Sequence, residues 1–267
     1  MGWQRVAIAC SVQALQEFTG TNIITYYAPY VMVHSVGLDS HQSLLLSGGL
    51  QLWFLVASFI PWYLPFLLLA LRIELICVRF VIDKIGRRKL FIIGSLGMGA
   101  CMLIAGLTLQ AGGKNNGIGT VVVLYMFQAF FTWGWMSNMW AYPSEILPIR
   151  IRQTGSALSV VWQWLITFLV VEITPVGIQN IGWKLYIVFC ILNWATIVVV
   201  WFFYPETAGR SLEQIDFLFA SQSSLRQVVK LSTRNDLDEM AVIRETQAQA
   251  HQQKADTKVE HNEHQST

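Results

Sequence analysis

The sequence has 267 residues, of which 54% are hydrophobic and only 13% are charged. This composition excludes an ordinary soluble domain of the same length, and a net charge of +2 does not indicate a nucleic-acid partner. The four cysteines form no CxxC pair, so the sequence predicts neither a metal site nor a disulfide framework. We therefore expect a polytopic membrane protein without a cofactor.

Six apolar segments are long enough to cross a bilayer as helices of about 20 residues. The predicted spans are 6–33, 44–64, 90–109, 119–141, 155–176 and 183–204. Lysine and arginine gather in alternate loops, at 84–89, at 150–152 and after the last span. Because basic loops usually stay inside, the N-terminus, these loops and the C-terminal tail are predicted to be cytoplasmic.

The first predicted span is the most polar of the six. It contains four strongly polar side chains, Gln13, Gln16, Glu17 and Asn22. The first three follow an i, i+3, i+4 pattern and share one helix face. Such groups are costly in a membrane unless they face a bundle interior or a watery cavity, so this face predicts a substrate pathway. Gly20 and Pro29 are expected to break the helix there. A face on which amides join neighbouring helices is the alternative.

The second apolar run continues without a charge from 44 to 71, which is too long for one span. The excess, about 65–81, carries Arg72, Glu74 and Arg79. If it crossed the membrane, the basic loops that follow would lie outside, against the charge rule. We therefore expect a membrane-embedded or interfacial insertion at 65–81.

Two predicted cytoplasmic loops carry complementary charges. The first loop contains Asp83, Gly86, Arg87 and Arg88, and the second contains Glu145 and Arg152. Gly86 permits a tight turn, and Asp83 can cap the next helix or pair with an arginine. Together the loops can form a charge cluster that locks one state of a two-state bundle. Alternatively, they are only topogenic basic loops.

These residues belong to four sequence motifs, which follow one another along the chain. They read QEFTGTNIITYY at 16–27, DKIGRR at 83–88, PSEILPIRIR at 143–152 and PETAGRSLEQID at 205–216. In this order they resemble the signatures of the C-terminal half of sugar porters of the major facilitator superfamily, over about residues 5 to 220. The resemblance implies an all-α, six-span half-bundle at 1–220, followed by a disordered cytoplasmic tail at 221–267.

The resemblance also implies a function and a set of site residues. It implies sugar transport by alternating access, as a facilitator or proton symporter, and no enzymatic activity. The implied sugar-binding positions are Gln13, Gln16, Asn22, Trp140 as a stacking aromatic, and Gln163. Glu17 stands where the family has a second Gln, and adds an acid that can pair, titrate or reject anions. The implied cytoplasmic gate comprises Asp83, Gly86, Arg87, Arg88, Glu145, Arg152 and Glu206.

Because the resemblance covers one half of the family's fold, a complete pathway is expected to need an N-terminal half or another transporter chain. The expected partners are a small-molecule sugar and a lipid bilayer, and the expected location is the plasma membrane. A rival function is a sugar-sensing receptor, because sensors share this fold and signal through long tails. A third alternative is an inactive product of a truncated or misassembled gene, in which 65–81 is a translated intron.

Overall fold

The computed structural model describes residues 2–34, 37–70, 86–221 and 224–233, and every regular element within these ranges is a helix. Five of the described segments are long and apolar enough to cross a membrane. They are Ser40–Phe59, Arg87–Ala111, Asn116–Ile146, Ile149–Ile181 and Lys184–Phe203. The predicted all-α membrane fold is therefore confirmed, with the most polar predicted span as a sixth, broken segment.

That first segment consists of three short helices, α1 (Gly2–Glu17), α2 (Thr21–Tyr26) and α3 (Ala28–His34). Between α1 and α2, Gly20 adopts a left-handed conformation with φ of 88°. A Cβ atom here would lie 2.9 Å from Met102 Cε and 3.0 Å from Phe189 Cδ1, so only glycine fits without rearrangement. Pro29 lies in the first turn of α3, where its missing N–H costs nothing. The predicted break is confirmed.

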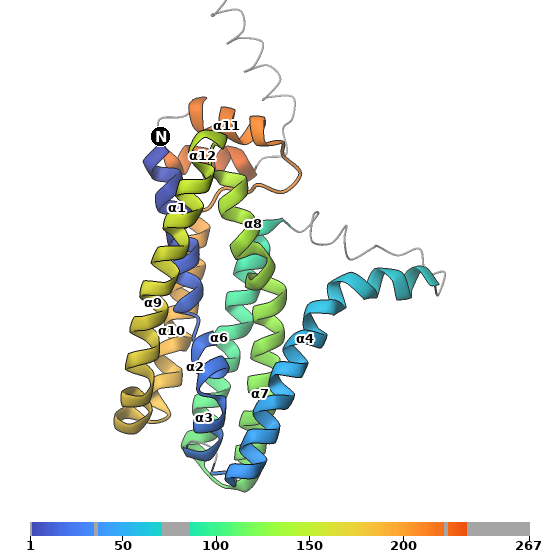
Figure 1. The fold of residues 1–267 in the computed structure, drawn as a ribbon, viewed down its shortest axis with the longest axis vertical. Helices are drawn as coiled ribbons and strands as arrows, with labels where there is room; N and C mark the ends of the chain where they lie inside the picture. The colour runs from blue at the N-terminus through green and yellow to red at the C-terminus, as the bar shows by residue number, and fades with distance from the viewer. Residues whose placement is uncertain (1, 35–36, 71–85, 222–223, 234–267) are drawn as a thin grey trace, which may run out of the picture. The chain divides into compact units, whose positions relative to one another are not determined.

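Helix α4 runs from Ser40 to Ala70, further than the predicted span 44–64. Its 31 residues extend over about 46 Å, well beyond a hydrocarbon core of roughly 30 Å. The helix continues through Pro61 and Pro65, and it bends in its C-terminal half (Figure 1). The remaining part of the predicted insertion, 71–81, lies outside the described residues, so its failure to cross the membrane stays a prediction.

The remaining membrane helices pack around the broken segment. They are α6 (Arg87–Ala111), α7 (Lys114–Phe131), the π-helix η1 (Thr132–Met136), α8 (Ser137–Ile146), the 3₁₀ turn η2 (Ile149–Ile151), α9 (Arg152–Ile181) and α10 (Lys184–Phe203). Helix α6 packs against α7 and α10, while α1 packs against α8 and α9. A Cβ at Gly134 of η1 would lie 2.6 Å from Gly94 Cα of α6, so two glycines permit a close backbone approach.

Two short helices, α11 (Leu212–Ser221) and α12 (Leu225–Thr233), lie at the end of the bundle where the N-terminus lies (Figure 1). Arg5 of α1 is ion-paired with Asp216 of α11, and its guanidinium lies 4.3 Å from the centre of the Phe219 ring. Helix α12 falls within the segment predicted as a disordered tail, and its Val228 side chain is buried. Residues 234–267 lie outside the described residues, so the disordered tail and the boundary at 220 stay predictions.

Candidate functional site

A cavity of about 170 Å³ lies beside the break between α1 and α2. Seven elements contribute to its wall, from the broken segment, α4, the α7–η1–α8 segment and α9. The lining residues are Gln16, Glu17, Thr21, Asn22, Thr25, Tyr26, Gln51, Phe54, Gln128, Phe131, Met136, Met139, Gln163, Trp164 and Thr167. The cavity therefore combines amides, hydroxyls and one carboxyl group with aromatic and apolar surfaces.

Four lining side chains have a buried oxygen that finds no hydrogen-bond partner among the described residues. These atoms are Gln16 Oε1, Thr21 Oγ1, Gln128 Oε1 and Gln163 Oε1. Leaving a buried polar group unpaired costs about 1–3 kcal/mol, and native structures rarely leave several together. The cavity is therefore arranged to pair with something that carries hydroxyl groups, whether water or a ligand.

Glu17 ends α1 and is only 2% exposed. The Asn22 amide of α2 donates a hydrogen bond to Glu17 Oε2, across the helix break. The side chains of Gln163 and Thr167 on α9 lie near this carboxyl group in the wall of the same cavity. The acid thus connects α1, α2 and α9 at the wall of the cavity.

The cavity brings together four of the six predicted sugar-binding residues: Gln16, Glu17, Asn22 and Gln163. Gln13 does not line it, because its Nε2 donates to the Met139 carbonyl at 3.0 Å and joins α1 to α8. Gln13 therefore fits the alternative interpretation of the first span, in which an amide joins neighbouring helices. Trp140 is 50% exposed and also lies outside the lining, so its stacking role stays a prediction. The aromatic side chain found beside Gln163 is Trp164.

Sequence reasoning missed Gln128, which is 3% exposed and lines the same cavity as the four predicted residues. It is the single amide in the apolar stretch VVVLYMFQAFF of α7. A lone amide at membrane depth is costly unless it faces the bundle interior. The rule that drew attention to the first span would have found Gln128 as well.

Asn193 of α10 holds the helix break in place. This fully buried side chain donates from Nδ2 to the Thr19 carbonyl at 2.8 Å and to the Phe189 carbonyl at 2.8 Å. Thr19 immediately precedes Gly20, so the bond from Asn193 holds the turn between α1 and α2. This turn sets how the cavity residues of the two helices are oriented toward the cavity. Asn193 is therefore a positioning residue, outside the cavity itself.

Replacing Asn193 by leucine should lower the free energy of unfolding by about 1–3 kcal/mol, because the Thr19 carbonyl then stays buried without this donor. Thermal unfolding in detergent, followed by circular dichroism, measures the change. The control is Thr196→Val on the same helix, since the Thr196 hydroxyl bonds only its own helix, at Leu192. Equal stability of the two variants would contradict this role of Asn193.

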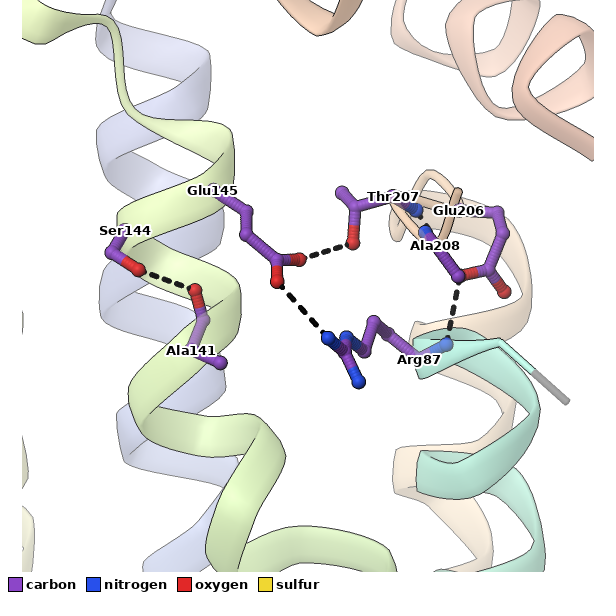
Figure 2. A network of polar contacts seen from close by, with 7 residues as sticks. All are labelled: Arg87, Ala141, Ser144, Glu145, Glu206, Thr207 and Ala208. Carbon is purple, nitrogen blue, oxygen red and sulfur yellow. Dashed lines mark hydrogen bonds and ion pairs between the residues drawn. The ribbon is translucent and has the colours of Figure 1, made fainter. Parts of the chain in front are cut away.

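A second polar cluster joins the start of α6, the end of α8 and the segment that follows α10 (Figure 2). Glu145 of α8 accepts from the Arg87 guanidinium at 3.3 Å and from the Thr207 hydroxyl at 2.6 Å. Glu206 accepts from the backbone N–H groups of Arg87 at 2.8 Å and Arg88 at 3.2 Å. Glu206 thus caps the N-terminus of α6, where partial positive charge favours a carboxylate.

The same Glu206 carboxylate accepts from the backbone N–H groups of Thr207 and Ala208, each at 3.1 Å. A Cβ at Gly86, where φ is 89°, would lie 2.4 Å from Glu206 Oε2. Gly86 is therefore needed for its backbone conformation and for the space that the capping carboxylate occupies.

The other predicted gate residues are placed differently. The Arg88 guanidinium donates to the Trp201 carbonyl and lies 4.8 Å from the centre of the Trp201 ring. Arg152 donates from Nε to the Leu147 carbonyl at 3.3 Å, so this contact closes its own loop. Asp83, the predicted cap of α6, lies outside the described residues, and Glu206 supplies the cap that is seen.

Comparison with known proteins shows which family this chain belongs to. A family model described as "Sugar (and other) transporter" matches residues 2–219. The chain belongs to the sugar transporter family. One relative in the family is "Sugar transporter STL1" of Saccharomyces cerevisiae, 36% identical over 81% of this chain and 35% of its own length. Another is "Major facilitator superfamily transporter mfsA" of Aspergillus fumigatus, 33% identical over 82% of this chain and 37% of its own length.

Among solved structures, the chain is similar to XylE, which is named a proton:xylose symporter. A XylE mutant structure superposes with a TM-score of 0.67 at 26% identity, over 81% of this chain and 43% of that chain. The chain therefore has the fold of a half-bundle of a major facilitator sugar transporter. It spans well under half of the length of the relatives that it matches.

Proposed function

We propose that this chain is the C-terminal half of a sugar transporter that works by alternating access. The observation that carries the proposal is the cavity of about 170 Å³ with four unpaired buried oxygens in its wall. A sugar carries many hydroxyl groups, each a donor and an acceptor, and so can satisfy amide and hydroxyl groups that point inward from several helices. The volume is several times the roughly 30 Å³ that one water molecule takes up in the liquid.

The lining favours a neutral substrate. None of the residues that line the cavity is Lys, Arg or His, while Glu17 contributes a carboxyl group. An anion bound there would lose its hydration without gaining a cationic partner, which is strongly unfavourable in a membrane interior. Sugars and other neutral polyhydroxyl compounds avoid this cost, and Trp164 and Phe54 offer apolar surfaces for their C–H faces.

We propose Gln16, Glu17, Asn22, Gln163 and Gln128 as the sugar-contacting set. We further propose that the residues of the second cluster form a gate that keeps the cytoplasmic ends of α6 and α8 together in one transport state. Exposed ion pairs contribute only about 0–1 kcal/mol. The support for a stronger effect is that Glu206 also receives four backbone N–H bonds and that Glu145 is held by two side chains.

A partner half should complete the pathway. Two cavity residues, Tyr26 and Trp164, are 55% and 60% exposed in the isolated chain, as expected for a wall that another half would cover. In the complete protein we place the N-terminus and the tail in the cytoplasm, as the loop charges favour, and we propose the plasma membrane as its location.

The test is uptake of D-glucose and D-xylose by cells that lack hexose uptake. We expect no saturable uptake from this chain alone, and saturable uptake when it replaces the matching half of the Saccharomyces relative. Uptake by the chain alone would contradict the need for a partner half. A replacement protein that reaches the membrane and transports neither sugar would contradict the function.

A further inference from the structure

The Glu17 carboxyl group is the acid of the cavity wall. It is 2% exposed, at the end of α1, and Asn22 donates to one of its oxygens. Apart from Glu17, the lining residues carry amide, hydroxyl, phenol, thioether, indole or phenyl side chains, and none of them is a carboxyl group, an imidazole or an amine. Any protonation change of the cavity near neutral pH therefore concerns Glu17.

No cationic side chain of the described helices that pack against α1 is placed to neutralise Glu17. On α9, Arg152 is about 22 Å along the helix from Thr167, which neighbours the acid, and Glu172 is exposed. On α8, Glu145 binds Arg87 and Thr207, at the bundle end. On α1 itself, Arg5 is paired with Asp216, about 18 Å along the helix from Glu17. Helix α2 contributes only the Tyr26 phenol.

An ionised carboxylate that is buried without a cation is costly, and the usual outcome is that the group takes up a proton. A protonated Glu17 would also gain an O–H donor. Two of the unpaired cavity acceptors are Gln16 Oε1, on the residue that precedes Glu17, and Gln163 Oε1, on a side chain that neighbours the acid. The protonated form of Glu17 is therefore favoured by the low dielectric of the buried site and by the unpaired hydrogen-bond acceptors of the cavity.

We propose that Glu17 is a proton-binding site of the cavity: it holds a proton while the cavity is closed to water and releases it to water when the cavity opens. In the binding step one proton from bulk water adds to a Glu17 carboxylate oxygen, and no other bond changes. Resting on the proposed function, this makes sugar binding proton-linked, since a sugar that displaces water from around the acid favours its neutral form.

Infrared spectroscopy of the full chain in lipid nanodiscs tests the site without requiring transport. A protonated carboxyl group gives a C=O stretching band that an ionised one lacks. We expect one such band at neutral pH that disappears in Glu17→Gln and reappears, shifted, in Glu17→Asp. The band should persist in Glu172→Gln, which removes an exposed carboxylate from the neighbouring α9.

Circular dichroism shows whether each variant keeps its helices, and Glu17→Asp supplies the comparison if the glutamine variant does not fold. Absence in the wild type of any band that changes with Glu17 overturns the proposal. A band lost in Glu17→Gln supports it. The band needs no sugar, so the proposed function is judged separately, on the chain assembled with the partner half. There D-glucose should strengthen the band at a pH where it is partly formed, and lack of any response counts against sugar binding while leaving the proton site supported.

Discussion

Glu206→Ala is expected to lower the free energy of unfolding of the helical bundle by about 2–3 kcal/mol. It removes the carboxylate that caps the N-terminus of α6, although Glu206 is distant from α6 in the sequence. Four backbone N–H groups, at Arg87, Arg88, Thr207 and Ala208, would lose their charged acceptor. Hydrogen bonds to charged groups contribute about 1.5–3 kcal/mol each where they are buried, and partial exposure of Glu206 reduces that sum.

Denaturant unfolding in detergent, followed by far-ultraviolet circular dichroism, measures this loss. The matched control is Glu172→Ala, which removes an exposed carboxylate from the middle of a membrane helix and should change stability far less. Glu206→Gln should be less damaging than Glu206→Ala, because the amide oxygen can still accept from the N–H groups that bond Oε1, whereas the negative charge and the acceptor for Arg88 N–H are lost. If Glu206→Ala and Glu172→Ala unfold alike, the cap does not stabilise the bundle as described.

The contacts of Glu206 also show where sequence reasoning reached its limit. The motif at 205–216 marked this residue as part of a gate, but the partner of its carboxylate is the start of a helix 119 residues earlier. Local rules look for a cap within a few residues of a helix start, and therefore pointed to Asp83. Long-range capping depends on how helices pack, which a single sequence does not specify.

The cavity was more predictable, because the cost of burying polar groups in a membrane operates at each residue. Gln16, Glu17, Asn22 and Gln163 were expected at one site and line one cavity. Gln13 shares the α1 face of Gln16 and Glu17 but lies a turn away from them, and its amide bonds the Met139 carbonyl of α8. A helix face defines a direction, whereas depth along the helix decides which neighbour a side chain meets.

The end of α4 depends on more than the length of one membrane crossing. The predicted span ended near residue 64 because the apolar run is too long for one crossing, and the described helix continues to Ala70, into the predicted insertion. Proline removes one hydrogen bond and bends a helix, and in a membrane the continuing chain still gains more from staying helical than from exposing its backbone groups. Hydrophobicity and proline positions alone do not separate a bend from an end.

Gln128→Ala is expected to weaken sugar binding about five- to hundredfold while leaving stability unchanged or slightly higher. The loss corresponds to about 1–3 kcal/mol for one unpaired sugar hydroxyl. Stability should not fall, because Gln128 Oε1 has no partner among the described residues and its burial already carries a cost. Gln163→Ala should weaken sugar binding over the same range. A residue that only supports the fold would lose stability and affinity together.

The matched control for both variants is Gln179→Ala. Gln179 lies on α9, like Gln163, but outside the cavity lining, and its exposed amide donates to the Tyr30 hydroxyl at 3.2 Å. Its removal should leave the dissociation constant within about twofold of the wild type, a difference of roughly 0.4 kcal/mol.

The most direct test of the central claim is equilibrium binding of radiolabelled D-glucose and D-xylose to this chain, purified in lipid nanodiscs together with the partner half described above. We expect saturable binding in the wild type and in Gln179→Ala, and dissociation constants about five- to hundredfold higher in Gln128→Ala and Gln163→Ala. Absence of saturable binding of either sugar to the wild-type assembly, or equal affinity in all four proteins, would contradict the assignment of this cavity as a sugar site.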